Sequence, residues 1–544
     1  MLRFIFVLLI ALLFVLLAAP FLDRPGLHYD EALEAGLPAT QLLAGLPVMS
    51  ANGVVLRAWG KEFPLMVQNH IGAIQVYTAI PFVSSFGPTV ESLRIMALST
   101  GVITLIATFA FMYQVYGLKA ACYGSIWLAI FPSFVFWFRQ GVFISSISPC
   151  LIMCALAIAV YGMRSRRLWL ISGAGLLLGL AAYSKLNALW VVISLVSWIL
   201  LQKTVFYVNF SNDVADYDVA NYNGKPSWKA ILMVILGFSV GFYPFILYNF
   251  ISKGATIIQI RANASSTYLG VNNANILANL QTRIFQLADV IRSGDHLWYL
   301  GGTFPSHIAL WSFIASLVIA LADCIVSRDK RWIKLIFAPL VILVAVLLSC
   351  FTISSLWPTH FAVISMFPAV VFGTGVQCLF DWGEKCNIQL KLTSRLIIAP
   401  LIFIVFTSQI CSDLRYLEAA KRTGGLSFHS SAIYDVYHFL EKRPEHLVAL
   451  DWGIAAQIEY LSGGRMHVEE LYDYSQGTSR EFANELRSRL NKDNLYITHA
   501  MYQEAFQRRE TFLQAVAAAG LHAQTVNVSI RGDGWPMIEV WQLQ

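Results

Sequence analysis

Long apolar runs, separated by short polar segments, fill the first three quarters of the chain. Because about 20 consecutive apolar residues cross the hydrocarbon core of a bilayer, the runs predict about eleven transmembrane helices. The run His70–Gly87 is short and contains Pro81, so it is expected to lie on the membrane surface. The predicted spans centre on Phe4–Phe21, Ile95–Tyr113, Ala120–Phe138, Pro149–Met163, Leu168–Tyr183, Ala188–Leu201, Ala230–Phe250, Ile308–Val326, Ile333–Phe351, Phe361–Phe380 and Leu396–Cys411.

Basic loops orient these spans. Clusters such as Arg164–Arg167 and Arg328–Arg331 fall on one side when the spans number eleven, and the positive-inside rule makes that side cytoplasmic. The outer side then receives the first loop (residues 23–94), a long loop (252–302) and the C-terminus. An even number of spans would instead place the C-terminus inside.

Residues 413–544 show the patterns of a small soluble α/β domain, which follows a predicted membrane domain of residues 1–412. Short runs rich in β-branched residues indicate strands, and two segments have helical periodicity. The predicted strands are Leu447–Asp451, Asn494–Thr498, Gln524–Ile530 and Met537–Leu543, and the predicted helices are Ser479–Leu490 and Tyr502–Ala519.

Composition supports this division. Hydrophobic residues make up 57% of the chain and charged residues 13%, whereas soluble proteins carry about 25% charged residues. The net charge is −4 from Asp413 onward and +10 before it. No basic stripe with interleaved aromatic residues indicates nucleic-acid binding. Eight cysteines show no spacing typical of a zinc site or a disulfide framework.

Two adjacent carboxylates, Asp30 and Glu31, lie just beyond the first predicted span, in a chain that has few charges. A carboxylate at a low-dielectric surface is suited to general-base catalysis, because the surroundings raise its pKa toward the working pH. The structural alternative is that Asp30 caps a short helix over Glu31–Gly36, with Glu31 in the first turn. Both interpretations are open at this point.

A series of short motifs follows this acidic pair. It continues with Lys61–Glu62–Phe63–Pro64, Glu91–Ser92–Leu93–Arg94, Arg139–Gln140–Gly141, Ser145–Pro149, and Gly175–Leu180 followed by Ser184–Lys185. In order and spacing, the series resembles the GT-C membrane glycosyltransferases. The resemblance is greatest to bacterial family-39 members, which are similar to protein O-mannosyltransferases and the lipid A aminoarabinose transferase. It covers about the first two hundred residues.

The resemblance implies an α-helical membrane enzyme that takes a sugar from a polyprenyl-phosphate carrier and transfers it, with inversion, to a hydroxyl of a lipid, glycan or protein acceptor. Asp30 would be the general base, and Glu31 would shape the site. The lipid phosphate and sugar would be bound by Lys61, Arg139, Lys185 and His360. Each has a structural alternative: pairing of Lys61 with Glu62, anchoring by Arg139 or Lys185 at the membrane surface, and a structural His360.

The sequence also departs from the aminoarabinose transferase pattern. Leu33 stands where that pattern has an arginine, and Ser148–Pro149 aligns with an Asp-Pro. No cofactor is expected to be required. A divalent metal is compatible with the family, but none is predicted, because serine is a poor ligand for hard metal ions.

The expected location is a bacterial inner (plasma) membrane, with the active site and the C-terminal domain extracytoplasmic. Membrane lipids are expected partners and nucleic acid is not. Two other functions stay open. A secondary transporter usually shows internal repeats and Gly- or Pro-broken mid-span helices with charges at membrane depth. Here no two-fold repeat is seen, and the polar residues crowd the predicted outer side. In a noncatalytic scaffold of the same fold, Asp30 would only cap a helix.

Overall fold

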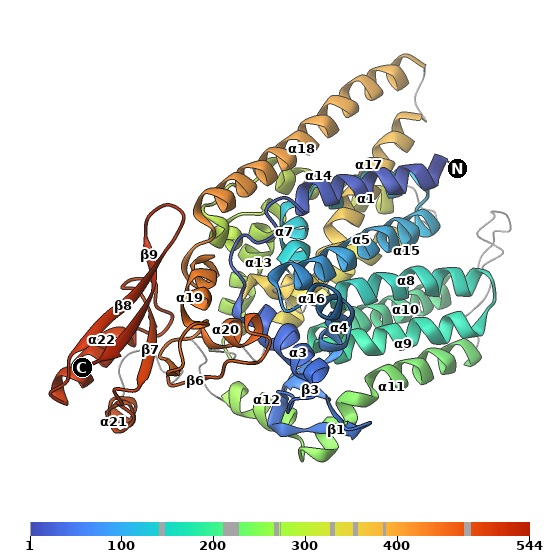
Figure 1. The fold of residues 1–544 in the computed structure, drawn as a ribbon. Coiled ribbons are helices and arrows are strands. Elements are labelled where there is room, and N and C mark those ends of the chain that lie inside the picture. The colour runs from blue at the N-terminus through green and yellow to red at the C-terminus, as the bar shows by residue number, and fades with distance from the viewer. Residues whose placement is uncertain are drawn as a thin grey trace.

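A helical bundle with a small sheet domain at one end makes up the computed structural model (Figure 1). It describes residues 2–140, 147–209, 228–265, 271–272, 274–326, 332–351, 357–384, 388–472 and 480–544. The N-terminus lies at one end of the bundle, and the C-terminal domain lies at the opposite end. The predicted fold class, a polytopic helical protein with a C-terminal α/β domain, is confirmed.

Within the described residues, six helical segments are long and apolar enough to cross a membrane, or up to eight if two bent pairs each count as one span. The six comprise α5 (Val90–Val115), α8 (Ile147–Arg164), α11 (Trp228–Ile251), α14 (His307–Val326), α15 with α16 (Trp332–Leu335, Phe337–Ser349) and α18 (Ile388–Thr423). The bent pairs are α6 with α7 (Leu118–Ala129, Pro132–Gln140) and η7 with α17 (Pro358–Ile364, Phe367–Glu384).

Shorter apolar helices complete the bundle. They are α1 (Leu2–Ala18), α4 (Ile74–Phe86), α9 (Leu168–Ser184) and α10 (Leu189–Asn209). Three of them, α1, α9 and α10, coincide with predicted spans, and α4 coincides with the run expected to lie on the surface. The count of about eleven spans depends on these short helices and stays a prediction.

Helices α9 and α11 approach each other through glycines. A Cβ added to Gly175 or Gly179 would lie 2.2 Å from a carbonyl oxygen of α11, and one added to Gly237 would lie 2.0 Å from the carbonyl oxygen of Ser172. Small residues four apart let two membrane helices pack backbone to backbone. The glycines of the 175–180 motif therefore fix α9, whose C-terminal end carries Lys185.

The first long loop, residues 23–94, contains one continuous helical stretch and two hairpins before α4. The stretch contains α2 (Tyr29–Glu31), the π-helical segment η1 (Ala32–Gly36) and α3 (Leu37–Ala44). Gly45 ends α3 in the left-handed conformation (φ 69°), which glycine adopts without steric cost. A short η2 turn (Ala51–Gly53) precedes the hairpin strands β1 (Val55–Ala58), β2 (Lys61–Pro64), β3 (Met66–Gln68) and β4 (Ile71–Gly72).

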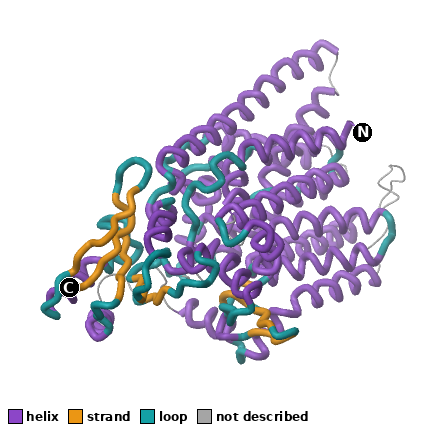
Figure 2. Tube along the Cα trace, viewed as in Figure 1, coloured by secondary structure: helices purple, strands orange, loops and turns teal. Residues whose placement is uncertain are grey.

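The second long loop, residues 252–302, contains α12 (Ala255–Ser265), α13 (Ile276–Arg292) and η6 (Asp295–Leu300). The C-terminal domain begins after α18, which continues through the predicted boundary at residue 412. Its sheet, the strands at the left in Figure 2, has the order β6-β5-β7-β9-β8. Strands β5, β6 and β7 are parallel, and β9 pairs antiparallel with β7 and β8.

The sequence predicted four strands and two helices of this domain within two residues at each end, except that the second helix begins at Arg509 and not at Tyr502. Observed are β5 (His446–Ala449), β7 (Asn494–His499), β8 (Ala523–Ile530), β9 (Pro536–Leu543), α21 (Arg480–Ser488) and α22 (Arg509–Ala518). Not predicted were α19 (Ala432–Leu440), α20 (Ala455–Leu461) and the short edge strand β6 (Val468–Glu470). A strand of this length has too few residues to show an alternating pattern.

Candidate active site

Asp30 lies in the middle of the three-residue turn α2, immediately beyond the first membrane helix. The N-cap of this turn is His28, whose Nδ1 accepts the Asp30 backbone N–H at 3.1 Å. Glu31 closes the capping box by accepting the His28 N–H at 3.0 Å. The alternative in which Asp30 is the N-cap is therefore wrong. His28 and Glu31 form the capping box, and the Asp30 carboxyl takes no part in it.

Glu31 is fully buried and forms a two-point ion pair with Arg94 from the start of α5. Arg94 Nε and Nη2 lie 3.2 and 3.0 Å from the two carboxylate oxygens. The same guanidinium donates to the carbonyl oxygens of Leu22, Pro25 and Gly26 at 2.7, 2.6 and 3.0 Å. Arg94 thus links Glu31 of α2 to the loop that precedes it, and Glu31 helps to fix the conformation next to Asp30.

A second acid, Glu34, lies one turn after Asp30 and was not predicted. It sits in the π-helical segment η1, a geometry that is found often at functional sites. Its Oε1 accepts from Gln68 Nε2 at 2.7 Å, and its side chain is buried. The four-residue spacing from Asp30, which places two residues on one helix face, was the sequence signal that could have identified it.

Lys185 brings a positive charge to these two carboxylates. It is the first residue after α9, and its backbone pairs with Ile71 of β4 in an isolated antiparallel bridge. Burial lowers the pKa of Lys185, and the charges of Glu34 and Asp30 oppose that effect. We refer to Asp30, Glu34 and Lys185 as the acid–lysine cluster.

Within the acid–lysine cluster, Asp30 has the properties of a base at neutral pH. About a third of its side chain (31%) is solvent-accessible, yet burial raises its pKa to about 6, against the opposing charge of Lys185. Burial also raises the pKa of Glu34 well above its ordinary value, and the charge of Asp30 adds to the rise. The two acids differ in surroundings, a pattern that enzymes use to separate acid and base roles.

His70 and His360 lie close enough to Lys185 to feel its charge, and Arg283 contacts His360. His360 from η7 has Nδ1 3.0 Å from Arg283 Nη2, and its carbonyl oxygen accepts from Asn187 at 3.3 Å. Arg283, from α13, is fully buried and was not predicted. Burial and the charge of Lys185 lower the pKa of His70 to about 4, so His70 is neutral at pH 7.

Several buried polar atoms beside Lys185 have no hydrogen-bond partner among the described residues. They include Ser184 Oγ, Asn187 Oδ1 and His70 Nδ1. Buried polar atoms in folded proteins are nearly always paired, so a group of unpaired ones needs an explanation. A bound polar ligand would supply the missing partners.

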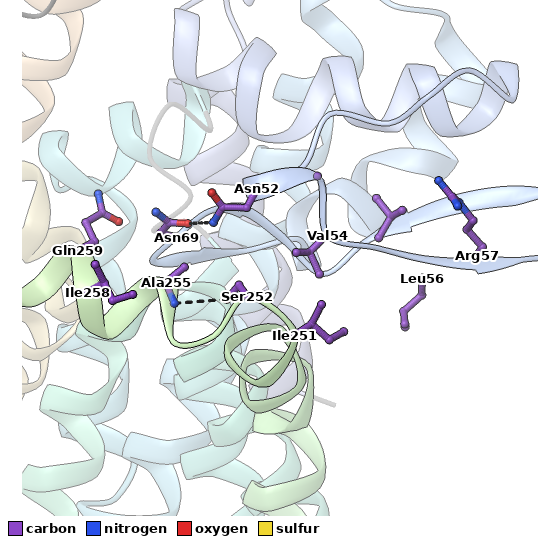
Figure 3. A pocket seen from close by; sticks show the side chains of 12 residues that line it. Asn52, Val54, Leu56, Arg57, Asn69, Ile251, Ser252, Ala255, Ile258 and Gln259 are labelled. Atoms are coloured by element: carbon purple, nitrogen blue, oxygen red, sulfur yellow. Dashed lines mark hydrogen bonds between the residues drawn. The ribbon is translucent and has the colours of Figure 1, made fainter.

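An open cleft of about 990 Å³ lies next to this polar region, between the β1 hairpin and the α11–α12 junction (Figure 3). Asn52, Asn69 and Gln259 contribute amide side chains to its lining, and Ile251 and Ile258 contribute apolar ones. Gln259 lies close enough to His70 to oppose the lowering of the His70 pKa by burial and by the charge of Lys185. The cleft is thus amphipathic and meets the polar region at Gln259.

The two other predicted phosphate ligands, Lys61 and Arg139, make contacts that differ from those of Lys185. Lys61 begins β2 and pairs with Ala58 across the hairpin turn, while its neighbour Glu62 accepts two bonds from Arg57 instead. Arg139 is fully buried at the end of α7. Its guanidinium donates to the carbonyl oxygens of Ala18, Phe21 and Arg24, which secures the segment between the first helix and α2.

Ser133 of α7 forms a buried Ser–His–Asp array with His296 and Asp289 of the long loop 252–302. His296 lies 2.8 Å from Asp289 and 3.0 Å from Ser133 Oγ, the order of contacts seen in hydrolase triads. Ser133 and His296 are buried, and the serine donates to Val290 O at 2.6 Å. The array therefore fastens α7 to this loop.

Among the described residues, no three His, Cys, Asp or Glu side chains converge in a way that could hold a metal ion. Asp451 was interpreted as a strand-end residue and lies just after β5. Its two oxygens accept from the backbone N–H groups of Trp452, Ala505 and Phe506 and from His499 Nδ1, at 2.8–3.1 Å. It is a saturated structural carboxylate.

Comparison with known proteins gives a clear result only at the level of structure. No family model matches the sequence, and no curated protein matches it. ArnT from Cupriavidus metallidurans, solved bound to undecaprenyl phosphate, matches with a TM-score of 0.60 at 10% identity, covering 99% of this chain and 97% of that one.

The archaeal oligosaccharyltransferase AglB from Archaeoglobus fulgidus, solved with an inhibitory peptide and a dolichol-phosphate, matches with a TM-score of 0.54 at 13% identity. The match covers 91% of this chain and 69% of that one. Both are GT-C glycosyltransferases. At these identities the likeness concerns the fold, and the expected resemblance is confirmed at that level: this chain has the GT-C fold.

Proposed function

We propose that this chain is a membrane glycosyltransferase that moves a sugar from a polyprenyl-phosphate carrier to an acceptor hydroxyl at the outer face of a membrane, with Asp30 as the general base. The observation that carries the proposal is the acid–lysine cluster, in which two carboxylates and a lysine lie beside buried polar atoms that have no partner among the described residues. The solved structures of similar fold hold undecaprenyl phosphate or dolichol-phosphate, which supports a lipid-phosphate donor.

The chemistry requires one base and one cation. The acceptor oxygen attacks the anomeric carbon and gives its proton to the Asp30 carboxylate. The bond between that carbon and the phosphate oxygen breaks, and its electron pair leaves with the phosphate. Attack opposite the leaving group inverts the configuration. A phosphate leaving group needs no proton, so a positive charge is enough to stabilise it.

Lys185 is the cation proposed for the phosphate, with His360 behind it. Ser184, Asn187 and His70 offer unpaired donors and acceptors, which suit the phosphate and the sugar hydroxyls. Arg139 is assigned to holding the first loop, because three backbone carbonyls already engage its guanidinium. The amphipathic cleft gives a membrane-borne substrate a path toward the cluster through Gln259.

The first test is binding. Purified protein in nanodiscs is titrated with a fluorescent polyprenyl phosphate, with the matching polyprenyl alcohol as the control that lacks the phosphate. Binding of the phosphate and not of the alcohol is expected, and Lys185→Met should weaken it about ten- to a hundredfold, the range for a charged hydrogen bond. Equal affinity for both lipids would contradict a phosphate site and favour a different class of membrane protein.

The second test is turnover. Proteoliposomes are supplied with polyprenyl-phosphate sugars and a membrane extract as the source of acceptor, and donor loss is followed by mass spectrometry. Donor consumption by the wild type, with retained binding but no consumption by Asp30→Asn, is the expected result. Consumption by Asp30→Asn at the wild-type rate would remove Asp30 from the role of base.

A further inference from the structure

The C-terminal domain packs directly on the helix that carries Asp30. Helix α20 lies against η1 and α3, and its residues Ala456 and Tyr460 belong to the same buried cluster as Tyr29 and Ala32. A Cβ added to Gly36 would lie 2.7 Å from the Tyr460 ring, so this contact requires glycine. The hydrophobic core under the Asp30 helix is therefore completed by residues more than four hundred positions away.

Polar contacts fix the same interface. Tyr29, the residue before Asp30, donates its hydroxyl to Glu470 Oε1 of β6 at 2.9 Å. Tyr460 donates to the carbonyl oxygen of Thr89 at 2.8 Å, and its hydroxyl lies 2.7 Å from Ser92 Oγ. These bonds connect the soluble domain to both ends of the first outer loop.

Aromatic contacts surround the N-cap of α2. The Trp452 ring lies 4.9 Å from Tyr29 and 5.5 Å from His28, and His28 stacks on His429 at 4.4 Å. The four bonds to Asp451 hold the loop that presents Trp452. This loop lies at the carboxyl ends of the parallel strands β5 and β7, where α/β sheets commonly carry their functional groups.

We propose that the C-terminal domain positions Asp30 for transfer, through the Tyr29–Glu470 bond, the Trp452 ring and the Tyr460 anchor. This inference rests on the proposed function. It gives a role to the C-terminal domain, to which the proposed function assigns no part. Glu470, Trp452 and Tyr460 are positioning residues, since they contact Tyr29, His28 and Gly36 around Asp30 and not the reacting atoms. Helix α2 opens the helical stretch that continues through η1 and α3, and helices in proteins owe most of their stability to tertiary packing. Its geometry therefore has to come from these tertiary contacts.

The test uses full-length variants that each remove one contact. Tyr29→Phe and Glu470→Leu delete the hydroxyl–carboxylate bond, whereas Glu470→Gln keeps an acceptor and serves as the conservative rescue. Tyr496→Phe is the matched control. Tyr496 is a buried tyrosine of the same sheet whose hydroxyl bonds only within the domain among its described contacts, to Arg489 O at 3.0 Å and Asn491 N at 2.7 Å.

Two readouts are measured. A hydrophobic carbodiimide modifies protonated buried carboxyls, so the pH midpoint of its reaction at Asp30, assigned by fragment-ion mass spectrometry, reports the state of Asp30 without any turnover. Sugar transfer is measured in parallel as kcat and KM for the donor. In Tyr29→Phe and Glu470→Leu, looser packing admits water to Asp30, so the labelling midpoint should fall. In the same variants kcat should fall about three- to tenfold with KM within about twofold.

Glu470→Gln and Tyr496→Phe should match the wild type in both readouts. The proposal is overturned if Tyr29→Phe and Glu470→Leu leave the midpoint and kcat unchanged, or if Tyr496→Phe changes them equally. A midpoint that shifts in a protein that transfers no sugar would refute the proposed function and leave the positioning role standing.

Discussion

Arg94 donates to both carboxylate oxygens of Glu31, at 3.0 and 3.2 Å, in a fully buried ion pair, and Glu31 also caps the helical turn that carries Asp30. The acid next to the proposed base therefore has a structural role. Arg94 also binds three backbone carbonyls of the preceding loop, so one guanidinium sets the path of the chain into α2. The Asp30–Glu31 pair therefore consists of the proposed base and a structural acid beside it.

Replacing Arg94 should destabilise the protein strongly. Arg94→Met leaves Glu31 buried without its partner, which costs about 3–5 kcal/mol for a broken buried pair. The control is Arg57→Met. Arg57 makes a similar two-point contact with Glu62 but is 81% exposed, and surface pairs contribute about 0–1 kcal/mol. Thermal unfolding in detergent should separate the two variants clearly, and equal losses of Tm would show that the Glu31–Arg94 pair contributes no more than a surface contact.

Asp30→Asn should lower kcat by about 10²–10⁴-fold, because the amide cannot take the acceptor proton. Folding should be unaffected, since the capping bonds use His28, Glu31 and the backbone of residue 30. Asp23→Asn is the control, a carboxylate of the same loop that is 45% exposed and pairs with Arg24 at 3.5 Å. Its turnover should equal that of the wild type. A shared loss in both variants would indicate a general charge effect of the loop.

The pH dependence of kcat/KM should show an acidic limb near pH 6. The base must be deprotonated to act, so activity is lost as the pH falls through the Asp30 pKa of about 6. Lys185 lowers that pKa by its charge. Lys185→Met should therefore move the acidic limb to higher pH, in addition to weakening donor binding. An unmoved limb would mean that another group controls the profile.

Glu34→Gln should leave the same limb in place. Burial and the charge of Asp30 raise the pKa of Glu34 well above its ordinary value, so Asp30 ionises first and Glu34 is neutral while it does. A neutral glutamine at position 34 therefore leaves the charge around Asp30 unchanged at that pH. The glutamine oxygen can still accept from Gln68, so the local fold is retained. In one buffer series the Glu34→Gln profile should overlay the wild-type profile while the Lys185→Met profile is displaced, and a Glu34→Gln limb moved to lower pH would show that Glu34 is charged when Asp30 titrates.

The sequence indicated Asp30, Glu31 and Lys185 because all three stand out as charges at the ends of apolar runs. It could not show that Glu31 faces Arg94, since that pairing joins residues 63 positions apart. Glu34 and Arg283 were missed for the same reason: neither is unusual until the fold brings it beside Lys185 or His360. The role of α20 was also invisible, because its contact with Gly36 depends on how two distant segments meet.

The orientation of the chain can be tested by thiol labelling at three exposed positions. Trp59, in the β1–β2 turn, is 92% exposed, Tyr502 in the C-terminal domain is 87% exposed, and Trp169 beside the basic cluster at residues 164–167 is 65% exposed. In intact cells, a membrane-impermeant maleimide should label Trp59→Cys and Tyr502→Cys and spare Trp169→Cys until the membrane is opened. The wild type gives the background from native cysteines, including the exposed Cys411.

Because the first loop and the C-terminal domain are in contact, labelling at Trp59→Cys without labelling at Tyr502→Cys would contradict the packing itself. Labelling of Trp169→Cys alone would invert the orientation and place the proposed active site in the cytoplasm.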